Sequence, residues 1–238
     1  DQELVGVYLW NLNACSEIYH LIATVEITLR NAIDQALVAN LERFWWSKKN
    51  LRYKSFNPLL NNSIKPDSIK KLSNNFSSAT LAVKHEKFSR YQSKAKPTHD
   101  EIIAKTEFST WEYVLDKEFL GPGLIWPQYM PTVFRGTWPT TKAKTTLTAI
   151  KDLVKTVRLF RNRIFHHEPA WKKAGVSNEV QAIQHLHDKI DTITRLIEII
   201  SPEKLNLLYE SKIIHNARYA CSSDEIKRFQ DGSNFGIK

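Results

Sequence analysis

The chain has 238 residues, of which 42% are hydrophobic, so it can bury a sizeable core as one large domain or as one domain with an inserted subdomain. Its formal charge of +9 favours a polyanionic partner, most simply RNA or another nucleic acid, although ordinary solubility charge is an alternative. No apolar run is long enough to cross a membrane, and the two cysteines, Cys15 and Cys221, are too few for a disulfide framework. A cytoplasmic protein is therefore expected.

Few glycines (7) and few alternating stretches favour an all-α protein. The chain opens at Asp1 and its single methionine is Met130, so we expect the natural N-terminus to lie upstream, and a lost leader stays open.

The first predicted element is a helix over residues 5–46, as one long helix or as two short ones in line, because apolar residues recur at helical spacing. Glu26, Arg30 and Asp34 are each four residues apart, so they can pair along a second face of this helix. A polar, Asn-rich loop is predicted over 47–65.

A weaker helix is predicted over 66–83, followed by a basic stretch over 84–98 that contains Phe88 and Tyr91. Two interpretations of this stretch are open. It is either a mobile basic linker or a clasp that holds a nucleic-acid backbone while the rings stack on bases.

Thr98 and Glu101 match a capping box, which predicts that a helix begins there and runs to about Asp116. Glycines and prolines then predict an irregular connection over 121–140, whose aromatic residues we assign to the core.

The next helix is predicted over 141–167, because Pro169 disfavours helical geometry at Glu168. A further helix over 178–200, capped by Ser177, and a short one from Ser201-Pro202 complete a single domain over 1–210. The tail over 211–238 is polar and is expected to be weakly ordered.

The end of the helix over 141–167 concentrates cationic side chains in the segment Arg161-Asn162-Arg163-Ile164-Phe165-His166-His167. Cleavage of RNA without a metal needs a base for the 2′-hydroxyl proton, positive charge for the phosphorane and an acid for the leaving oxygen. His166 can act as base or acid, Arg161 can hold the phosphate, and the Asn162 amide can orient either partner.

The helical spacing limits how these groups can meet. Arg161 and His166 are five apart, or roughly 140° around the axis, whereas Asn162 and His166 share a face. We therefore favour a homodimer in which two copies of the helix complete each other's sites. The structural alternative is that Arg161 and Arg163 pair with acidic neighbours while the histidines cap the helix end.

A metal site at His166, His167 and Glu168 is disfavoured, because adjacent histidines on a helix point apart and the usual ligand spacings are absent. His185 and His187, two residues apart on a helix, add little. We therefore expect no metal and no cofactor.

Three sequence blocks resemble a known family. Arg161-Asn162-x3-His166 resembles the Arg-x(4–6)-His signature of HEPN (higher eukaryotes and prokaryotes nucleotide-binding) ribonucleases. The longer string RNRIFHHEPAW resembles the Abi-like, abortive-infection family of bacterial phage-defence proteins. So do the block Tyr8–Asn11 with Val25–Ile33, and the block Glu107–Trp111.

The resemblance implies an all-α, HEPN-type helical bundle with an additional helical and irregular insertion, and a metal-independent endoribonuclease, a hydrolase that acts as a toxin in antiviral defence. It implies Arg161 and His166 as the catalytic pair with Asn162 beside them. His167 is an equally placed candidate. Phe165 stands where relatives often have a small residue.

Candidate substrate-binding residues are Arg163, Arg158, Glu26, Arg30 and Asn31, although a structural salt bridge explains Glu26 and Arg30 equally well. Some members of the family are linked to a structured non-coding RNA. An RNA-binding module with absent or latent catalysis is therefore a second hypothesis, and a protein-interaction scaffold is a third.

Overall fold

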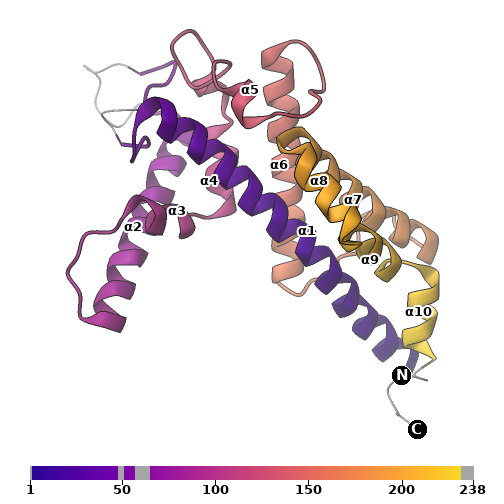
Figure 1. Ribbon diagram of the computed structural model, residues 1–238. Helices are drawn as coiled ribbons and strands as arrows, with labels where there is room; N and C mark the ends of the chain where they lie inside the picture. The colour runs from indigo at the N-terminus through magenta and orange to yellow at the C-terminus, as the bar shows by residue number, and fades with distance from the viewer. Residues whose placement is uncertain (1, 48–50, 57–64, 232–238) are drawn as a thin grey trace. The chain divides into compact units, whose positions relative to one another are not determined.

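The computed structural model describes residues 2–47, 51–56 and 65–231, and it confirms the all-α prediction (Figure 1). Helices account for 71% of the described residues, and the β pairing among them is one isolated bridge between Leu120 and Trp126. The α-helices are α1 (Gln2–Leu41), α2 (Asp67–Tyr91), α3 (His99–Ala104), α4 (Phe108–Val114), α5 (Met130–Val133), α6 (Ala143–Phe165), α7 (Glu179–Ile200), α8 (Pro202–Glu210), α9 (Ile213–Ala220) and α10 (Ser223–Gln230).

The chain divides into two compact units, where the sequence analysis treated 1–210 as one domain. Unit 1 comprises 1–27 with 156–238, and unit 2 comprises 28–155. The divisions fall within α1 and α6, so each of these helices contributes residues to both units. The segment with the cationic cluster at the end of α6 belongs to unit 1.

Helix α1 is one continuous helix rather than two short ones in line. It ends at Leu41 because Glu42 adopts a left-handed conformation (φ 75°) while its amide still donates to the Val38 carbonyl at 3.1 Å. The predicted end at residue 46 was therefore several residues too late. The predicted loop over 47–65 is irregular where it is described, and residues 48–50 and 57–64 lie outside the described residues.

In unit 2, α2 is longer than predicted and runs to Tyr91. Residues 84–91 are its last two turns, so the interpretation of 84–98 as a mobile basic linker is wrong for them, while the alternative of a nucleic-acid clasp stays a prediction. The helix ends at Gln92, whose left-handed conformation (φ 51°) lets its amide donate to the Phe88 carbonyl at 2.9 Å. Residues 92–98 form the actual connection.

The helix predicted from Thr98 to about Asp116 is two short helices, α3 and α4. Thr106 accounts for the break, because its hydroxyl donates to the Ile103 carbonyl at 2.7 Å and its amide donates to the same oxygen at 3.2 Å. Such local side-chain bonds compete with continuation of a helix.

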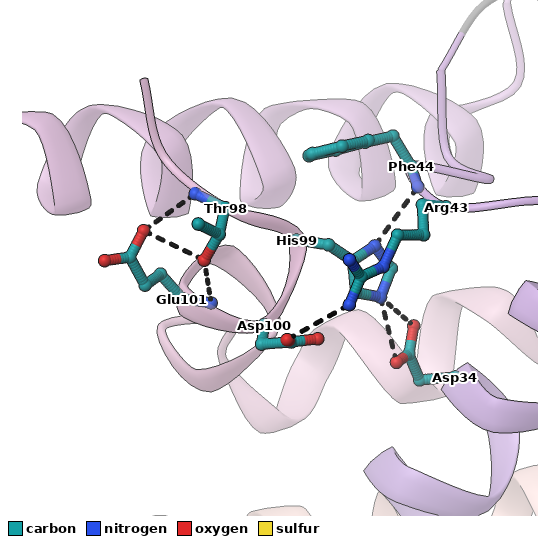
Figure 2. A network of polar contacts seen from close by, with 7 residues as sticks. All are labelled: Asp34, Arg43, Phe44, Thr98, His99, Asp100 and Glu101. Atoms are coloured by element: carbon teal, nitrogen blue, oxygen red, sulfur yellow. Dashed lines mark hydrogen bonds and ion pairs between the residues drawn. The ribbon is translucent and has the colours of Figure 1, made fainter. Parts of the chain in front are cut away.

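The capping box at the start of α3 is confirmed (Figure 2). The Glu101 amide donates to Thr98 Oγ1 at 3.3 Å, and the Thr98 amide donates to Glu101 Oε2 at 2.7 Å. This backbone bond and then the bond from Lys87 lower the pKa of Glu101 to about 2.

The irregular connection over 121–140 is confirmed apart from the single turn of α5. Its aromatic residues include core members, as predicted: Trp126 and Phe134 are buried, and Trp126 Nε1 donates to the Val114 carbonyl at 2.9 Å. This segment therefore closes the core of unit 2.

In unit 1, α7 packs against α8, α9 and α10. Helix α7 is capped by Asn178 rather than by Ser177, because Asn178 Oδ1 accepts from the Gln181 amide at 3.0 Å. Helix α8 begins at Pro202, as predicted.

The expectation of a weakly ordered tail over 211–238 was wrong for residues 211–231, since α9 and α10 are short amphipathic helices that bury Ile214, Ala217, Ile226 and Phe229. The remainder of that tail, 232–238, lies outside the described residues.

Candidate functional site

Helix α6 ends at Phe165, two residues before the predicted end. The backbone hydrogen bonds at this end give His166 and His167 different conformations. The His167 amide donates to the Ile164 carbonyl at 3.1 Å, and the Glu168 amide donates to the Arg163 carbonyl at 3.1 Å. This pair of bonds is a Schellman motif with His167 at the left-handed position (φ 56°), which usually holds glycine. The chain therefore leaves the helix before Pro169 is reached.

Arg161 lies against α1, where its guanidinium contacts three groups. Its Nε lies 3.7 Å from Glu26 Oε2, its Nη1 lies 3.5 Å from Asn162 Oδ1, and its central carbon lies 4.1 Å from the centre of the Phe165 ring. The Phe165 ring in turn lies 5.4 Å from the ring of Tyr19 on α1. Both polar contacts are long for hydrogen bonds, so they hold the guanidinium loosely. The whole Arg161 side chain is 31% exposed, whereas its Nε atom is buried.

Asn162 and His166 lie on one side of the helix end, as predicted. The His166 amide donates to the Asn162 carbonyl at 2.9 Å, so helical hydrogen bonding continues through His166. Arg158 precedes Asn162 by four residues and therefore belongs to the same line. Arg158 and Asn162 are half-buried, and His166 and His167 are exposed.

Arg163 points away from Arg161, because two residues on an ideal helix are roughly 200° apart. Its Nε lies 3.3 Å from Glu168 Oε2. Arg161 and Arg163 thus both pair with acidic neighbours, and His167 occupies the helix-ending turn. These are the contacts of the structural alternative, and they are compatible with a site whose charges also receive a ligand.

The segment after the histidines is anchored to α1. Asn11 is buried, and its Oδ1 accepts from the Ala170 amide at 3.0 Å. One residue earlier, Trp10 Nε1 donates to the Ala220 carbonyl at 2.8 Å. Asn11 therefore fixes the chain that follows His166 and His167, and Trp10 fixes the end of α9.

Of the predicted N-terminal cluster, Glu26 lies in the same unit as Arg161 and pairs with it. Arg30 and Asn31 belong to unit 2, where Arg30 Nε is buried without a hydrogen-bond partner and Asn31 is exposed. Asp34, the expected partner of Arg30 along the helix, accepts from His99 Nε2 and from Trp45 Nε1.

The His99–Asp34 pair has the composition of a catalytic dyad but not its geometry (Figure 2). His99 Nε2 lies 3.0 Å from both Asp34 oxygens, and the Phe44 amide donates to His99 Nδ1 at 3.1 Å. Both ring nitrogens are therefore engaged, and the ring is only 2% exposed. This pair is a structural link between α1 and α3, because no ring nitrogen remains for a substrate proton.

Unit 1 contains a second group of cations, which the sequence analysis did not bring together: Arg163, Lys173, His185 and Lys189. Burial lowers the pKa of His185, and Lys189, Lys173 and Arg163 lower it further. Burial likewise lowers the pKa of Lys189, with Lys173 and Arg163 adding to the effect. The signal available in the sequence is the four-residue spacing that places His185 and Lys189 on one helix face.

Two further features, a metal-binding cluster and a membrane-spanning helix, were considered within the described residues. Within them, no group of three or more His, Cys, Asp or Glu side chains is arranged to hold a metal ion. None of the helices in the same ranges combines the length and apolar character that a membrane-spanning segment requires.

Comparisons of this chain with protein-family models, with curated proteins and with solved structures found no match. The resemblance to HEPN and Abi-like proteins therefore stays a prediction that rests on the three sequence blocks. The arrangement of side chains must carry any functional argument.

Proposed function

We propose that this chain is a metal-independent endoribonuclease of the HEPN type that acts in bacterial phage defence and cleaves RNA by attack of the 2′-hydroxyl. The observation that carries the proposal is the position of Arg161. Its guanidinium is loosely held between Glu26 and Phe165, one turn before two exposed histidines. A guanidinium with long protein contacts can exchange them for the shorter, charge-assisted bonds that a phosphate offers.

The roles follow from chemistry and position. Arg161 holds the scissile phosphate and stabilises the charge that develops on it. His166 transfers the proton to or from the ribose and the leaving oxygen. Asn162 lies in line with His166 and orients it or the substrate. His167 is the alternative acid or base.

The left-handed backbone at His167 is shared with Glu42 and Gln92, which end α1 and α2. A non-glycine residue in this conformation costs on the order of 1 kcal/mol relative to its ordinary one. The conformation therefore describes how α6 ends, and the proposed role of His167 rests on its exposed imidazole, which follows His166 in the same segment as Arg161.

A homodimer would bring Arg161 of one copy toward His166 of the other. Within one copy the two side chains are disfavoured from meeting, because residues five apart on a helix are separated by roughly 140° around its axis. Exposed apolar residues beside Arg161 support a second copy as the partner. Tyr8, Leu12 and Tyr19 lie on one face of α1, and Phe165 adjoins Tyr19; each is at least 38% exposed. Self-association should be weakened by Tyr19→Glu and unchanged by Tyr209→Glu on α8, as measured by sedimentation.

The direct test is cleavage of mixed RNA by the purified protein in excess chelator. Arg161→Ala and His166→Ala should each lower the rate by roughly 10²-fold or more. Arg195→Ala and His215→Ala are matched controls, since Arg195 has similar exposure and an acidic partner, and His215 is exposed. Cleavage that is absent in the parent protein, or equal in all five proteins, would defeat the proposal.

A second function is favoured by a specific observation. Arg161 and Arg163 each already face a carboxylate, Glu26 and Glu168 respectively. Such pairs suit an RNA-binding module that holds a cognate structured RNA without cleaving it. RNA affinity that falls in Arg161→Ala, together with intact RNA after long incubation, would favour this function over the nuclease.

A further inference from the structure

The cations on the far side of α6 from Arg161 converge on one place. The ammonium of Lys189 on α7 lies 6.0 Å from the centre of the Phe160 ring on α6. Arg163 lies three residues after Phe160, and His185 lies four residues before Lys189, so each is one turn further along the same helix face. Since α6 and α7 are joined by the segment 166–178 and Lys189 contacts Phe160, Arg163 and His185 extend from that contact toward the joining segment.

Lys173 in the joining segment completes the group. The charges of Lys173 and Arg163 both lower the pKa values of His185 and Lys189, so each lies within electrostatic range of these two side chains. The acidic groups that face them are Asp188, which acts on His185 and Lys189, and Glu168, which pairs with Arg163. Cations therefore outnumber carboxylates in this group whenever His185 is protonated, and still do when it is neutral.

Burial makes this excess costly. His185 is only 7% exposed and Lys189 is half-buried, whereas Lys173 is exposed. Arg163 Nε is buried and makes no hydrogen bond of good geometry, although Glu168 Oε2 lies 3.3 Å away as an ion-pair partner. Like charges gathered away from water repel one another, and the repulsion is relieved when an anion enters.

We propose that Arg163, Lys173, His185 and Lys189 form a site for a phosphate group of a bound RNA strand, separate from the cleavage site around Arg161. The inference rests on the proposed function, because it takes RNA as the ligand. Arg161 and Arg163 face opposite sides of α6, so a strand that crosses the end of this helix meets one site for the scissile phosphate and another for a neighbouring one. Arg163 supplies a planar fork, and the two lysines supply point charges.

The test uses a short single-stranded RNA whose 2′-hydroxyls are all methylated, so that it cannot be cleaved by 2′-hydroxyl attack. Fluorescence anisotropy measures its affinity for the parent protein and for Lys173→Gln/Lys189→Gln. The double variant should bind about tenfold or more weakly. The slope of log affinity against log salt should shrink by about 0.7, which corresponds to the loss of one phosphate contact on a single strand. Lys227→Gln, an exposed lysine of α10, is the control and should bind nearly like the parent.

The melting temperature of the double variant provides a second measurement. A phosphate site predicts that it rises, whereas a purely structural role of the lysines predicts that it falls. If the lysines repel their neighbours, the double variant should melt at a higher temperature than the parent in the absence of RNA, by a few degrees. If Lys189 serves only to pack on Phe160, its replacement lowers the melting temperature, and that result contradicts the proposal.

The His185 ring reports the ligand by NMR. Addition of the methylated RNA should shift its resonances and raise its pKa, because a phosphate relieves the repulsion. If inorganic phosphate shifts His185 while the RNA does not, the site takes a small phosphate ligand and the proposal is overturned. The same holds if the parent protein and the double variant bind the RNA equally.

The two proposals fail separately. In the first case, unmodified RNA is cleaved in a way that depends on Arg161, but the parent protein and the double variant bind methylated RNA equally. This result contradicts the second site and supports the nuclease. In the second case, the double variant loses binding of methylated RNA, but neither the parent protein nor any variant cleaves unmodified RNA. This result supports the second site and contradicts the nuclease.

Discussion

Replacement of Gly6 by alanine tests whether α10 docks on the start of α1. Gly6 is buried in α1, and a Cβ atom there would lie 2.6 Å from the Gln230 Cα atom and 2.7 Å from the Phe229 carbonyl oxygen. Both atoms are backbone, so neither can move aside without moving α10. The substitution therefore forces the two helices apart.

Two effects of opposite sign decide the result. Alanine is a better helix former than glycine by about 1 kcal/mol, which would stabilise α1. Overpacking typically costs about 1–3 kcal/mol, and displacement of α10 also exposes part of Ile226 and Phe229, each worth roughly 1.5–3 kcal/mol when fully buried. The clash should win, and Gly6→Ala should lower the free energy of unfolding by about 1–3 kcal/mol.

Urea unfolding of the intact chain and of a chain that ends at Ser222, each measured with and without the Gly6→Ala substitution, completes the experiment. Without α10 the clash is absent, so the substitution should become stabilising by about 1 kcal/mol. A stabilising effect in the intact chain would refute the docking of α10 on α1.

Three further predictions concern single groups. Because its folded pKa of about 2 lies below the ordinary 4.5, Glu101 should stabilise the protein above about pH 4.5 and lose this effect as the pH falls toward 2. Glu101→Gln should flatten acid unfolding in that window, and an unchanged profile would contradict the capping geometry. His167→Gly should keep or raise the melting temperature because φ is 56°, and a fall in cleavage without a fall in stability would assign His167 to the chemistry. Burial raises the pKa of Cys15 to about 11 and that of Cys221 to about 12. Both thiols should therefore react with a disulfide reagent only after unfolding, and rapid native-state labelling would count against their burial.

The sequence predicted the helices whose apolar residues repeat over many turns. Helix α1 and helix α6 were found within a few residues of their ends, and the capping box at Thr98 located the start of α3. Each of these signals is local, since a repeat or a cap depends on residues within one or two turns.

The errors arose where local signals were weak or misleading. The last two turns of α2 are rich in lysine, which resembles a linker, and their helical state is stabilised by contacts such as Lys87–Glu101. Helices α9 and α10 are only eight residues long, too short for their apolar faces to stand out. Their order depends on packing against distant segments, as the bond from Trp10 to the Ala220 carbonyl illustrates.

The candidate site divides in the same way. Asn162 and His166 were correctly placed in line, because that relation is set by helical spacing alone. The left-handed conformation of His167 and the loose contact of Arg161 with Glu26 could not be predicted from the sequence, because both depend on the path that the chain takes between helices. The grouping of Lys173 with His185 and Lys189 depends on the three-dimensional path of the chain after α6, as the contact between Lys189 and Phe160 illustrates, and the sequence does not show this path.

The central claim is that the 2′-hydroxyl of the RNA is the attacking group. The most direct measurement uses an RNA in which the ribose on the 5′ side of a mapped cleavage position is replaced by 2′-deoxyribose, incubated with the protein in excess chelator. The account predicts that cleavage stops at that bond alone, while neighbouring bonds yield ends that carry a 2′,3′-cyclic phosphate. Continued cleavage at the deoxy position would contradict it.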